Sequence, residues 1–413
     1  MPLIQNDTMV LAILLLILAL VTKTAASSRP VFKNFYKYVP PLLLCYFIPG
    51  ILNTFHIISG ENSGVYTVAS QYLLPASLIL IIMSVDLKQI WKLRHKAGLM
   101  FLATAIGIML GGPLAMIITD TFVPGVIVKG MGEDASWRGL ATLAASWTGG
   151  SANMAAMYEV FKPSPDLYSG MIAIDVLLAN IWLAMMLYLV NKKDKINKLL
   201  KADDDLNQTL EHIGNTNSDT TRKMPSMPDL FVILFLGLGG TGLAHLITSY
   251  VVPYIETHAP SLKQFNLDSK FLWVILLTTS MGVLLSFTKA RNYEKQGAPI
   301  IGNTFLYILI ASIGMQMNIL KAFDNPGLIL VCAIWLLFMG IVIVAVARIF
   351  KVNFFFLSVA SEANVGGVPT ASAVATAFSP TLVPVAVLLS VLGYSIGNYA
   401  GYICAILMQL VSQ

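Results

Sequence analysis

The residues best suited to chemistry are an acid and two glycine pairs, all set in otherwise apolar sequence. Glu362 lies in an apolar stretch and is followed by the polar break NVGGVPT at residues 364–370. A similar break, TGGSAN, occupies residues 148–153 in the first half of the chain. Two interrupted hydrophobic segments at corresponding places in two halves are the best sequence indication of a transporter's binding site.

The breaks offer backbone groups to ligands. Peptide groups released from a helix inside a bilayer are tolerated only where they are buried in protein or line a polar cavity. The half-helix after Gly150 opens with Ser151 and Asn153, and its partner opens near Thr370 and Ser372, just after Pro369. Free N–H groups at these helix starts suit a carboxylate. The preceding half-helices end in carbonyls near residues 146–147 and 363–364, which suit a small cation.

Glu362 favours a cation site. A carboxylate inside an apolar segment costs a few kcal/mol and should therefore have a partner. The deep parts of the predicted spans contain no Lys or Arg. We therefore expect a bound Na⁺, with H⁺ as the alternative, and an oxygen shell completed by Asn364 and Ser361. In the other interpretation, Glu362 stays protonated and forms a hydrogen bond within the helix bundle.

Asp175, in the middle of a predicted span, supports the same argument less strongly. Its counterpart in the second half is Gly393, so the repeat predicts no paired site. A Na⁺ role, shared with Ser146, and a helix-packing hydrogen bond both remain open. Asn180 and Asn398 match across the halves, and packing is the favoured role for each.

The composition indicates a polytopic membrane protein. The 413 residues are 56% hydrophobic and 11% charged, with a mean hydropathy of +0.75. Such a chain has too few polar residues to cover a water-soluble surface. The three cysteines form neither a disulfide framework nor a zinc pattern. The expected surroundings are the lipid bilayer, and the net charge of +5 predicts no nucleic-acid partner.

Ten apolar segments have the length that a bilayer requires. They are residues 8–22, 38–55, 65–85, 97–118, 167–190, 228–252, 271–287, 298–316, 326–346 and 382–410. Two further segments, 137–161 and 354–379, are apolar at their ends and polar in the middle. Each of these two is either a crossing helix or a re-entrant hairpin.

The distribution of positive charge favours hairpins. With both broken segments entering and leaving on one side, 20 of the 26 Lys and Arg residues fall on the cytoplasmic side. Each half then has five crossings, both termini lie outside, and the 191–227 linker is cytoplasmic. Because five is odd, the second half is inverted relative to the first. We expect the protein in the bacterial cytoplasmic (inner) membrane.

The predicted fold is all-α, with two inverted repeats of five transmembrane helices plus one hairpin or broken helix each. The first repeat is 1–190, with scaffold 1–60 and core 65–190. The second is 228–413, with scaffold 228–290 and core 298–413. Weak matches support the repeat: residues 83–87 with 315–319, Gln71 with Asn303, the two glycine pairs, and Pro163 with Pro380.

The stretch ASEANVGGVPTAS at residues 360–372, together with TGGSANM at residues 148–154, resembles a prokaryotic membrane family of unknown function, the YjcL-like proteins. More distantly, the two breaks resemble those of the glutamate:sodium, 2-hydroxycarboxylate:sodium and bile-acid:sodium symporters. That resemblance implies inverted five-span repeats, hairpins that carry the Na⁺ and substrate sites, elevator-type alternating access and a homodimer.

Carried over by position, the resemblance implies a Na⁺ role for Glu362 and Asn364. It implies substrate contacts at Gly149, Gly150, Ser151, Asn153, Gly366, Gly367 and Thr370. The hydroxycarboxylate pattern has a further glycine two residues after each pair, where this chain has Ser151-Ala152 and Val368-Pro369. The substrate of those families is therefore not transferred.

Three functions follow from these residues. The first is Na⁺-coupled symport of a small anionic or zwitterionic solute, such as an amino acid, organic acid or short peptide. The second is cation:proton antiport through Glu362 and Asp175. The third, an intramembrane serine protease using Ser151, is disfavoured because no histidine lies near the breaks. We expect a transporter that is not an enzyme.

Overall fold

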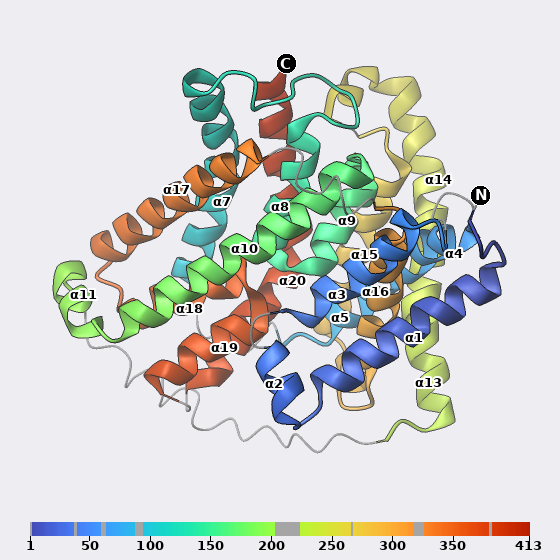
Figure 1. Ribbon diagram of the computed structural model, residues 1–413, viewed down its shortest axis with the longest axis horizontal. Coiled ribbons are helices and arrows are strands. Elements are labelled where there is room, and N and C mark those ends of the chain that lie inside the picture. The colour runs from blue at the N-terminus through green and yellow to red at the C-terminus, as the bar shows by residue number, and fades with distance from the viewer. Residues whose placement is uncertain are drawn as a thin grey trace.

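The computed structural model describes residues 2–36, 39–58, 63–86, 94–202, 224–265, 267–317, 326–379 and 382–413. Within these ranges the chain is helical and contains no strand (Figure 1). The helices of the first half are α1 (Asp7–Ala25), α2 (Pro30–Tyr36), α3 (Pro41–Thr54), α4 (Gly64–Val68), α5 (Leu74–Met83), α7 (Leu99–Phe122), α8 (Ser136–Gly149), α9 (Ser151–Phe161), α10 (Pro165–Val190) and α11 (Lys193–Leu200).

The second half contains α13 (Met227–Leu234), α14 (Gly240–His258), α15 (Lys270–Ser286), α16 (Ala298–Gly314), α17 (Gly327–Ile349), α18 (Phe354–Val365), α19 (Gly367–Phe378) and α20 (Val383–Ser412). One π-helical turn (Ala69–Leu73) joins α4 to α5, and another (Phe235–Gly239) joins α13 to α14. Because the helix runs on through these turns, each joined pair forms one long element.

Each of the ten apolar segments expected from the sequence forms a helix. Among the described residues, seven helices are long and apolar enough to cross a membrane, as expected for a multi-pass membrane protein. Helices α15 and α16 have 17 residues each, which is the lower end of a spanning length, and α3 is shorter, with 14 residues. Side-chain caps at Ser63, Ser164 and Ser269 begin three of the helices.

Both broken segments fold back on themselves. In hairpin 1, made of α8 and α9, the Trp137 and Phe161 rings lie 5.5 Å apart. In hairpin 2, made of α18 and α19, the Phe354 and Phe378 rings lie 5.9 Å apart. A continuous helix of 25 residues would hold its ends roughly 36 Å apart. The sequence prediction of hairpins rather than straight helices therefore agrees with the observed shape.

The helices pack as two bundles. The framework bundle contains α1, α3, α4, α5, α13, α14, α15 and α16, with α5 packed against α15 and α16, and α16 against α3. The hairpin bundle contains α7, α10, α17, α20 and the two hairpins, with α7 packed on α17 and α8 on α20. In Figure 1 the framework bundle lies to the right and the hairpin bundle to the left and centre. By packing, α5 and α16 belong to the framework.

A strip of three glycines on α20 brings this helix unusually close to hairpin 1. A Cβ at Gly393 would lie 2.7 Å from the Thr148 carbonyl oxygen, and one at Gly397 would lie 2.7 Å from the Gly149 Cα. A Cβ at Gly401 would be 2.7 Å from that of Ala145. Small residues allow two backbones to approach closely in a membrane bundle. This glycine strip therefore fixes hairpin 1 to α20.

Candidate functional site

The two hairpin tips share one backbone feature, a glycine with positive φ at the second position of each pair. Gly150 and Gly367 both have positive φ angles, +79° and +74°, in a region that side chains rarely adopt. In each tip, the side chain four residues after the first glycine of the pair packs against that glycine. A Cβ at Gly149 would collide with Asn153 Nδ2, and one at Gly366 would collide with Thr370 Oγ1.

The match between the tips holds at a constant shift of 217 positions: 149 to 366, 150 to 367 and 153 to 370. The same shift relates the aromatic pairs at the hairpin bases, 137 to 354 and 161 to 378. The sequence predicted the alignment of the glycine pairs. It did not reveal the equivalent pairing at the bases.

Hairpin 2 carries buried oxygen atoms with incomplete hydrogen bonding. Glu362 has no exposed surface, and neither of its carboxylate oxygens accepts a hydrogen bond of standard geometry among the described residues. The Thr370 hydroxyl is the one side chain there that interacts with this carboxylate as a donor. Asn364 is 1% exposed, and its Oδ1 is also without a donor. The Asn364 amide group instead donates to the carbonyls of Phe101 (3.3 Å) and Ala360 (2.9 Å). Three acceptor oxygens near one tip are thus left for a ligand that can compensate negative charge.

The hydroxyl groups around Glu362 are only partly available to it. Ser361 Oγ donates to the Ser358 carbonyl and accepts a hydrogen bond from Trp182 Nε1 at 3.1 Å. Thr370 Oγ1 and Glu362 Oε2 both lie beside the position that a Gly366 Cβ would occupy. Thr370 donates to the Gly367 carbonyl at 3.3 Å. Its oxygen lone pairs remain usable by a cation.

The predicted substrate residues of hairpin 1 divide into two groups. Gly150 and Ser151 are half-buried, whereas Gly149 and Asn153 are buried. The Asn153 amide donates to the Gly149 carbonyl at 2.9 Å and to the Gly393 carbonyl at 3.4 Å, which places it against the glycine strip. Its Oδ1 has no partner among the described residues. On hairpin 2, Gly366, Gly367 and Ser372 are half-buried.

Asp175 accepts two hydrogen bonds, unlike Glu362. Ser146 Oγ donates to one of its oxygens at 2.7 Å and Trp147 Nε1 to the other at 2.9 Å. The Ser146 carbonyl, which the sequence offered to a cation, accepts the Gly150 N–H at 2.7 Å. The five predicted cation ligands therefore fall in two clusters: Ser146 and Asp175 beside hairpin 1, and Ser361, Glu362 and Asn364 in hairpin 2.

Helix α10 holds both clusters. Asp175 contacts hairpin 1, and Trp182, seven residues later, contacts Ser361 of hairpin 2. Seven residues are about two helical turns, so the two side chains lie on one face roughly 10 Å apart. This face of α10 connects the ends of the two hairpins.

The matched asparagines differ in environment. Asn398 is fully buried and donates to Thr279 Oγ1 at 2.9 Å across the two bundles. Asn180 is exposed and donates to the Val176 carbonyl of its own helix. Neither contacts a hairpin tip through these bonds. Several residues used in the sequence argument, among them residues 203–205, Lys88, Lys92, residues 318–319 and Pro380, lie outside the described residues.

Sequence reasoning missed one buried acid. Glu159, near the end of α9, is 3% exposed and accepts a hydrogen bond from the Tyr66 hydroxyl of α4. The sequence alone could have identified Glu159 as a candidate, because it lies close to the apolar end of a broken segment. Its partner, 93 positions earlier, could not have been identified in this way.

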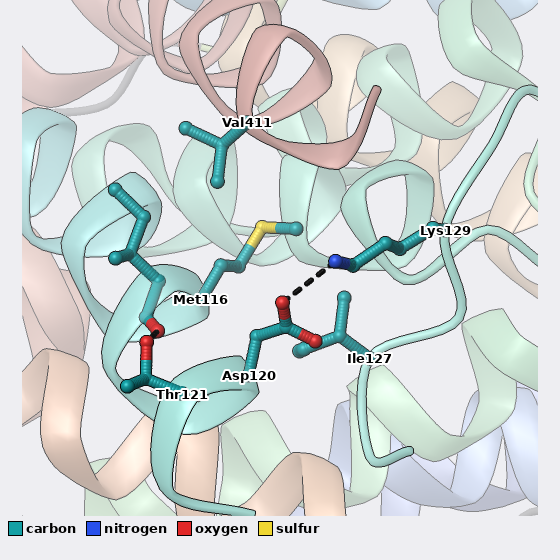
Figure 2. Close-up of a pocket in the computed structure, with 7 residues that line it drawn as sticks. Met116, Asp120, Thr121, Ile127, Lys129 and Val411 are labelled. Carbon is teal, nitrogen blue, oxygen red and sulfur yellow. Dashed lines mark hydrogen bonds and ion pairs between the residues drawn. The ribbon is translucent and has the colours of Figure 1, made fainter. Parts of the chain in front are cut away.

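A small surface pocket lies away from the hairpin tips. It has a volume of about 110 Å³ and is lined by α7, α20 and the loop after α7 (Figure 2). Lys129 Nζ and Asp120 Oδ2 form an ion pair at 2.7 Å across it. Because its two charges neutralise each other, the pocket has no free charge with which to hold an ionic ligand.

The resemblance to a family of unknown function is confirmed by comparison with known proteins. Residues 12–411 match the family described as "Protein of unknown function (DUF819)". The "Uncharacterized membrane protein YjcL" of Bacillus subtilis (strain 168) is 24% identical over 355 residues, which cover 82% of this chain and 83% of that protein. A buried acid and two glycine tips are thus set within a multi-pass membrane protein that belongs to the DUF819 family.

Proposed function

We propose that this protein is a secondary active transporter in which Glu362 of hairpin 2 binds the coupling cation. The observation that carries this proposal is the group of three buried acceptor oxygens on Glu362 and Asn364 that accept no hydrogen bond of standard geometry among the described residues. A buried carboxylate is costly unless it is paired. No described lysine or arginine forms an ion pair with it. A bound cation would supply the missing positive charge.

The chemical types of the available ligand atoms favour a hard cation such as Na⁺. Hard cations take oxygen ligands, and the available atoms are carboxylate, amide and hydroxyl oxygens from Glu362, Asn364 and Thr370. Backbone carbonyls at the end of α18 can add to these, because the last carbonyls of a helix have no intrahelical partner. Ser361 is the weakest member of the predicted set, since its hydroxyl already has two partners.

The solute that we propose is a small carboxylate-bearing molecule. The N-termini of α9 and α19 begin at the two tips, and each offers free N–H groups and about half a positive charge. Half-buried residues there, such as Ser151 and Thr370, leave polar surface at the entrance. Gly149 and Asn153 would act by shaping the tip, because they are buried against α20.

The matched packing of the two halves supports this function. Within each half α1 packs on α3 as α14 packs on α15, and between the halves α5 packs on α15 as α16 packs on α3. Such matching is expected of an inverted repeat. In our proposal the hairpin bundle moves against the framework in an elevator-like manner. In each half the boundary between the framework and the hairpin bundle then lies after the third span. The scaffold segments predicted from the sequence end earlier, at residues 60 and 290.

We place the protein in a bacterial inner membrane as a homodimer with both termini outside and the 191–227 linker in the cytoplasm. The excess of Lys and Arg in that linker and in the loops on the same side supports this orientation. The exposed apolar surface of the framework, which includes Leu243, Leu246 and Tyr250 of α14, is available for lipid or a second copy.

The test is Na⁺-dependent stabilisation of the purified protein. A ligand that binds only the folded state raises its apparent stability, by about 2.7 kcal/mol at one hundred times the Kd. We expect NaCl, but not choline chloride, to raise the unfolding temperature of the wild type. We expect E362Q to lose this response and E256Q, which alters an exposed glutamate of α14, to keep it.

A solute screen completes this experiment. Small carboxylates added in NaCl should give a further stabilisation, and proteoliposomes should take up the stabilising compound when a Na⁺ gradient is imposed. A full Na⁺ response in E362Q would refute the assigned site. Proton movement driven by Na⁺ alone, with no stabilising solute, would instead support the cation:proton antiporter.

A further inference from the structure

Glu159 is a buried acid that the proposed cation site does not use. It lies on α9 two residues before the end of hairpin 1, and only 3% of its surface is exposed. The Tyr66 hydroxyl donates to its Oε1. Tyr66 belongs to α4 of the framework, and Glu159 belongs to the hairpin bundle. The hydrogen bond therefore joins the two bundles.

Aromatic residues surround this contact and extend it. The Tyr158 and Tyr168 rings lie 4.3 Å apart, and the hydroxyl groups of Tyr168 and Tyr46 lie 3.2 Å apart. Tyr46 comes from α3 of the framework. A line of phenol groups thus runs along the boundary between the bundles, with Glu159 as its acid.

The ionisable groups near Glu159 do not neutralise it. Tyr66, Tyr158, Tyr168 and Lys162 interact electrostatically with Glu159, and the attraction of Lys162 acts without an ion pair. The two helices packed most closely on α9 also carry Arg138 on α8 and Tyr394, Tyr399 and Tyr402 on α20. Helix α5 has no ionisable side chain, and α15 has only Lys270 at its start. Lys162 is exposed, and Arg138 donates to the Phe161 and Met131 carbonyls. Glu159 forms no ion pair with a described lysine or arginine.

A proton is the ion that these surroundings can accommodate. Sodium and divalent cations need several oxygen ligands, whereas the one side-chain hydrogen bond recorded for Glu159 among the described residues comes from Tyr66. The Tyr66 hydroxyl donates its proton to the carboxylate, and the neighbouring surfaces are aromatic rings. A proton needs only the carboxyl group itself.

We propose that Glu159 is a proton-binding site at the contact between the two bundles. While the bundles touch, the Tyr66 hydroxyl stabilises the carboxylate. When α9 moves away from α4, the carboxylate loses its donor, and it takes up a proton from the solvent. The coupling to movement rests on the transport function proposed above, whereas proton binding at equilibrium does not.

Infrared titration of the purified protein tests this site without a solute, a gradient or Na⁺. We expect the carbonyl stretch of a protonated carboxylic acid to grow as the pH is lowered, and E159Q to lack the Glu159 part of this band. E256Q, which removes an exposed glutamate, should remove only a component that titrates like a solvated acid. Y66F should move the Glu159 component to higher pH, because the carboxylate loses its donor. Y250F, on an exposed tyrosine of α14, should not.

Two results would overturn the inference. One is a spectrum of E159Q identical to that of the wild type at every pH. The other, which remains informative if E159Q folds poorly, is an unchanged titration in Y66F. A full Na⁺ response in E362Q, which would refute the proposed cation site, together with a normal Glu159 titration would leave the Glu159 site standing, so a failure of one proposal can be told from a failure of the other.

Discussion

Hairpin 1 and hairpin 2 share a backbone design but differ in what their tips leave unsatisfied. Both turn at a glycine with positive φ, and both are closed at the base by an aromatic pair. At hairpin 1 the nearby acid, Asp175, comes from α10 and accepts two hydrogen bonds from α8. At hairpin 2 the acid, Glu362, belongs to the hairpin and has no hydrogen bond of standard geometry among the described residues, with only the Thr370 hydroxyl interacting with it.

This difference in hydrogen bonding indicates different roles for the two acids. Acceptors that are already satisfied add to the stability of the fold, whereas orphaned acceptors cost stability until a ligand arrives. Hairpin 1 is also fixed by the glycine strip of α20, whereas a Cβ at Gly367 of hairpin 2 would meet nothing within 4 Å. We conclude that hairpin 1 is the more firmly anchored tip, and our proposal places cation binding at hairpin 2.

The largest expected effect is on the anchoring of hairpin 1. A leucine in place of Gly397 would force its side chain into Asn153 and the Gly149 backbone. We expect a loss of roughly 3 kcal/mol or more of stability, measured as the unfolding midpoint of the detergent-purified protein. Gly242→Ala, where a Cβ meets nothing within 4 Å, is the control. Equal midpoints for the two variants would show that the strip does not anchor the hairpin.

The next effect contrasts the two acids. Asp175→Asn leaves either Ser146 or Trp147 without a suitable acceptor, and we expect it to destabilise the protein by about 1–3 kcal/mol. Glu362→Met removes a carboxylate that accepts no hydrogen bond of standard geometry from the described residues, and we expect unchanged or increased stability in Na⁺-free buffer. Thermal unfolding in choline chloride measures both. The opposite ranking would mean that Glu362 is the structural acid of the pair.

The smallest effect tests the likeness of the tips. Gly150→Ala and Gly367→Ala each place a side chain at positive φ, which costs about 1–3 kcal/mol, and no close steric clash adds to this cost. We expect similar losses for the two variants. Gly132→Ala, at an exposed loop position with open space around it, should have little effect. A loss at only one tip would break the equivalence of the hairpins.

The sequence predicted much of this arrangement because its strongest signals are local. Apolar runs of spanning length placed the helices, and the glycine pairs located the turns within one residue. Glu362 was identifiable because an acid in an apolar run must be compensated. Each of these inferences needs only neighbouring residues.

Other features depend on partners distant in the chain. Nothing in the sequence shows that Trp147 and Ser146 satisfy Asp175 while Glu362 accepts no hydrogen bond of standard geometry from the described residues. The Tyr66–Glu159 contact joins residues from different bundles. The glycine strip was visible as Gly393, Gly397 and Gly401, one helical turn apart, but its target on α8 was not.

The spacing of Asp175 and Trp182 on α10 has a mechanical consequence. A single helix contacts both hairpins, because Asp175 accepts a hydrogen bond from hairpin 1 and Trp182 donates one to hairpin 2. A helix that slides or rolls carries every side chain on that face with it. If a bound ion displaces one hairpin, α10 alone can therefore transmit the displacement to the other hairpin.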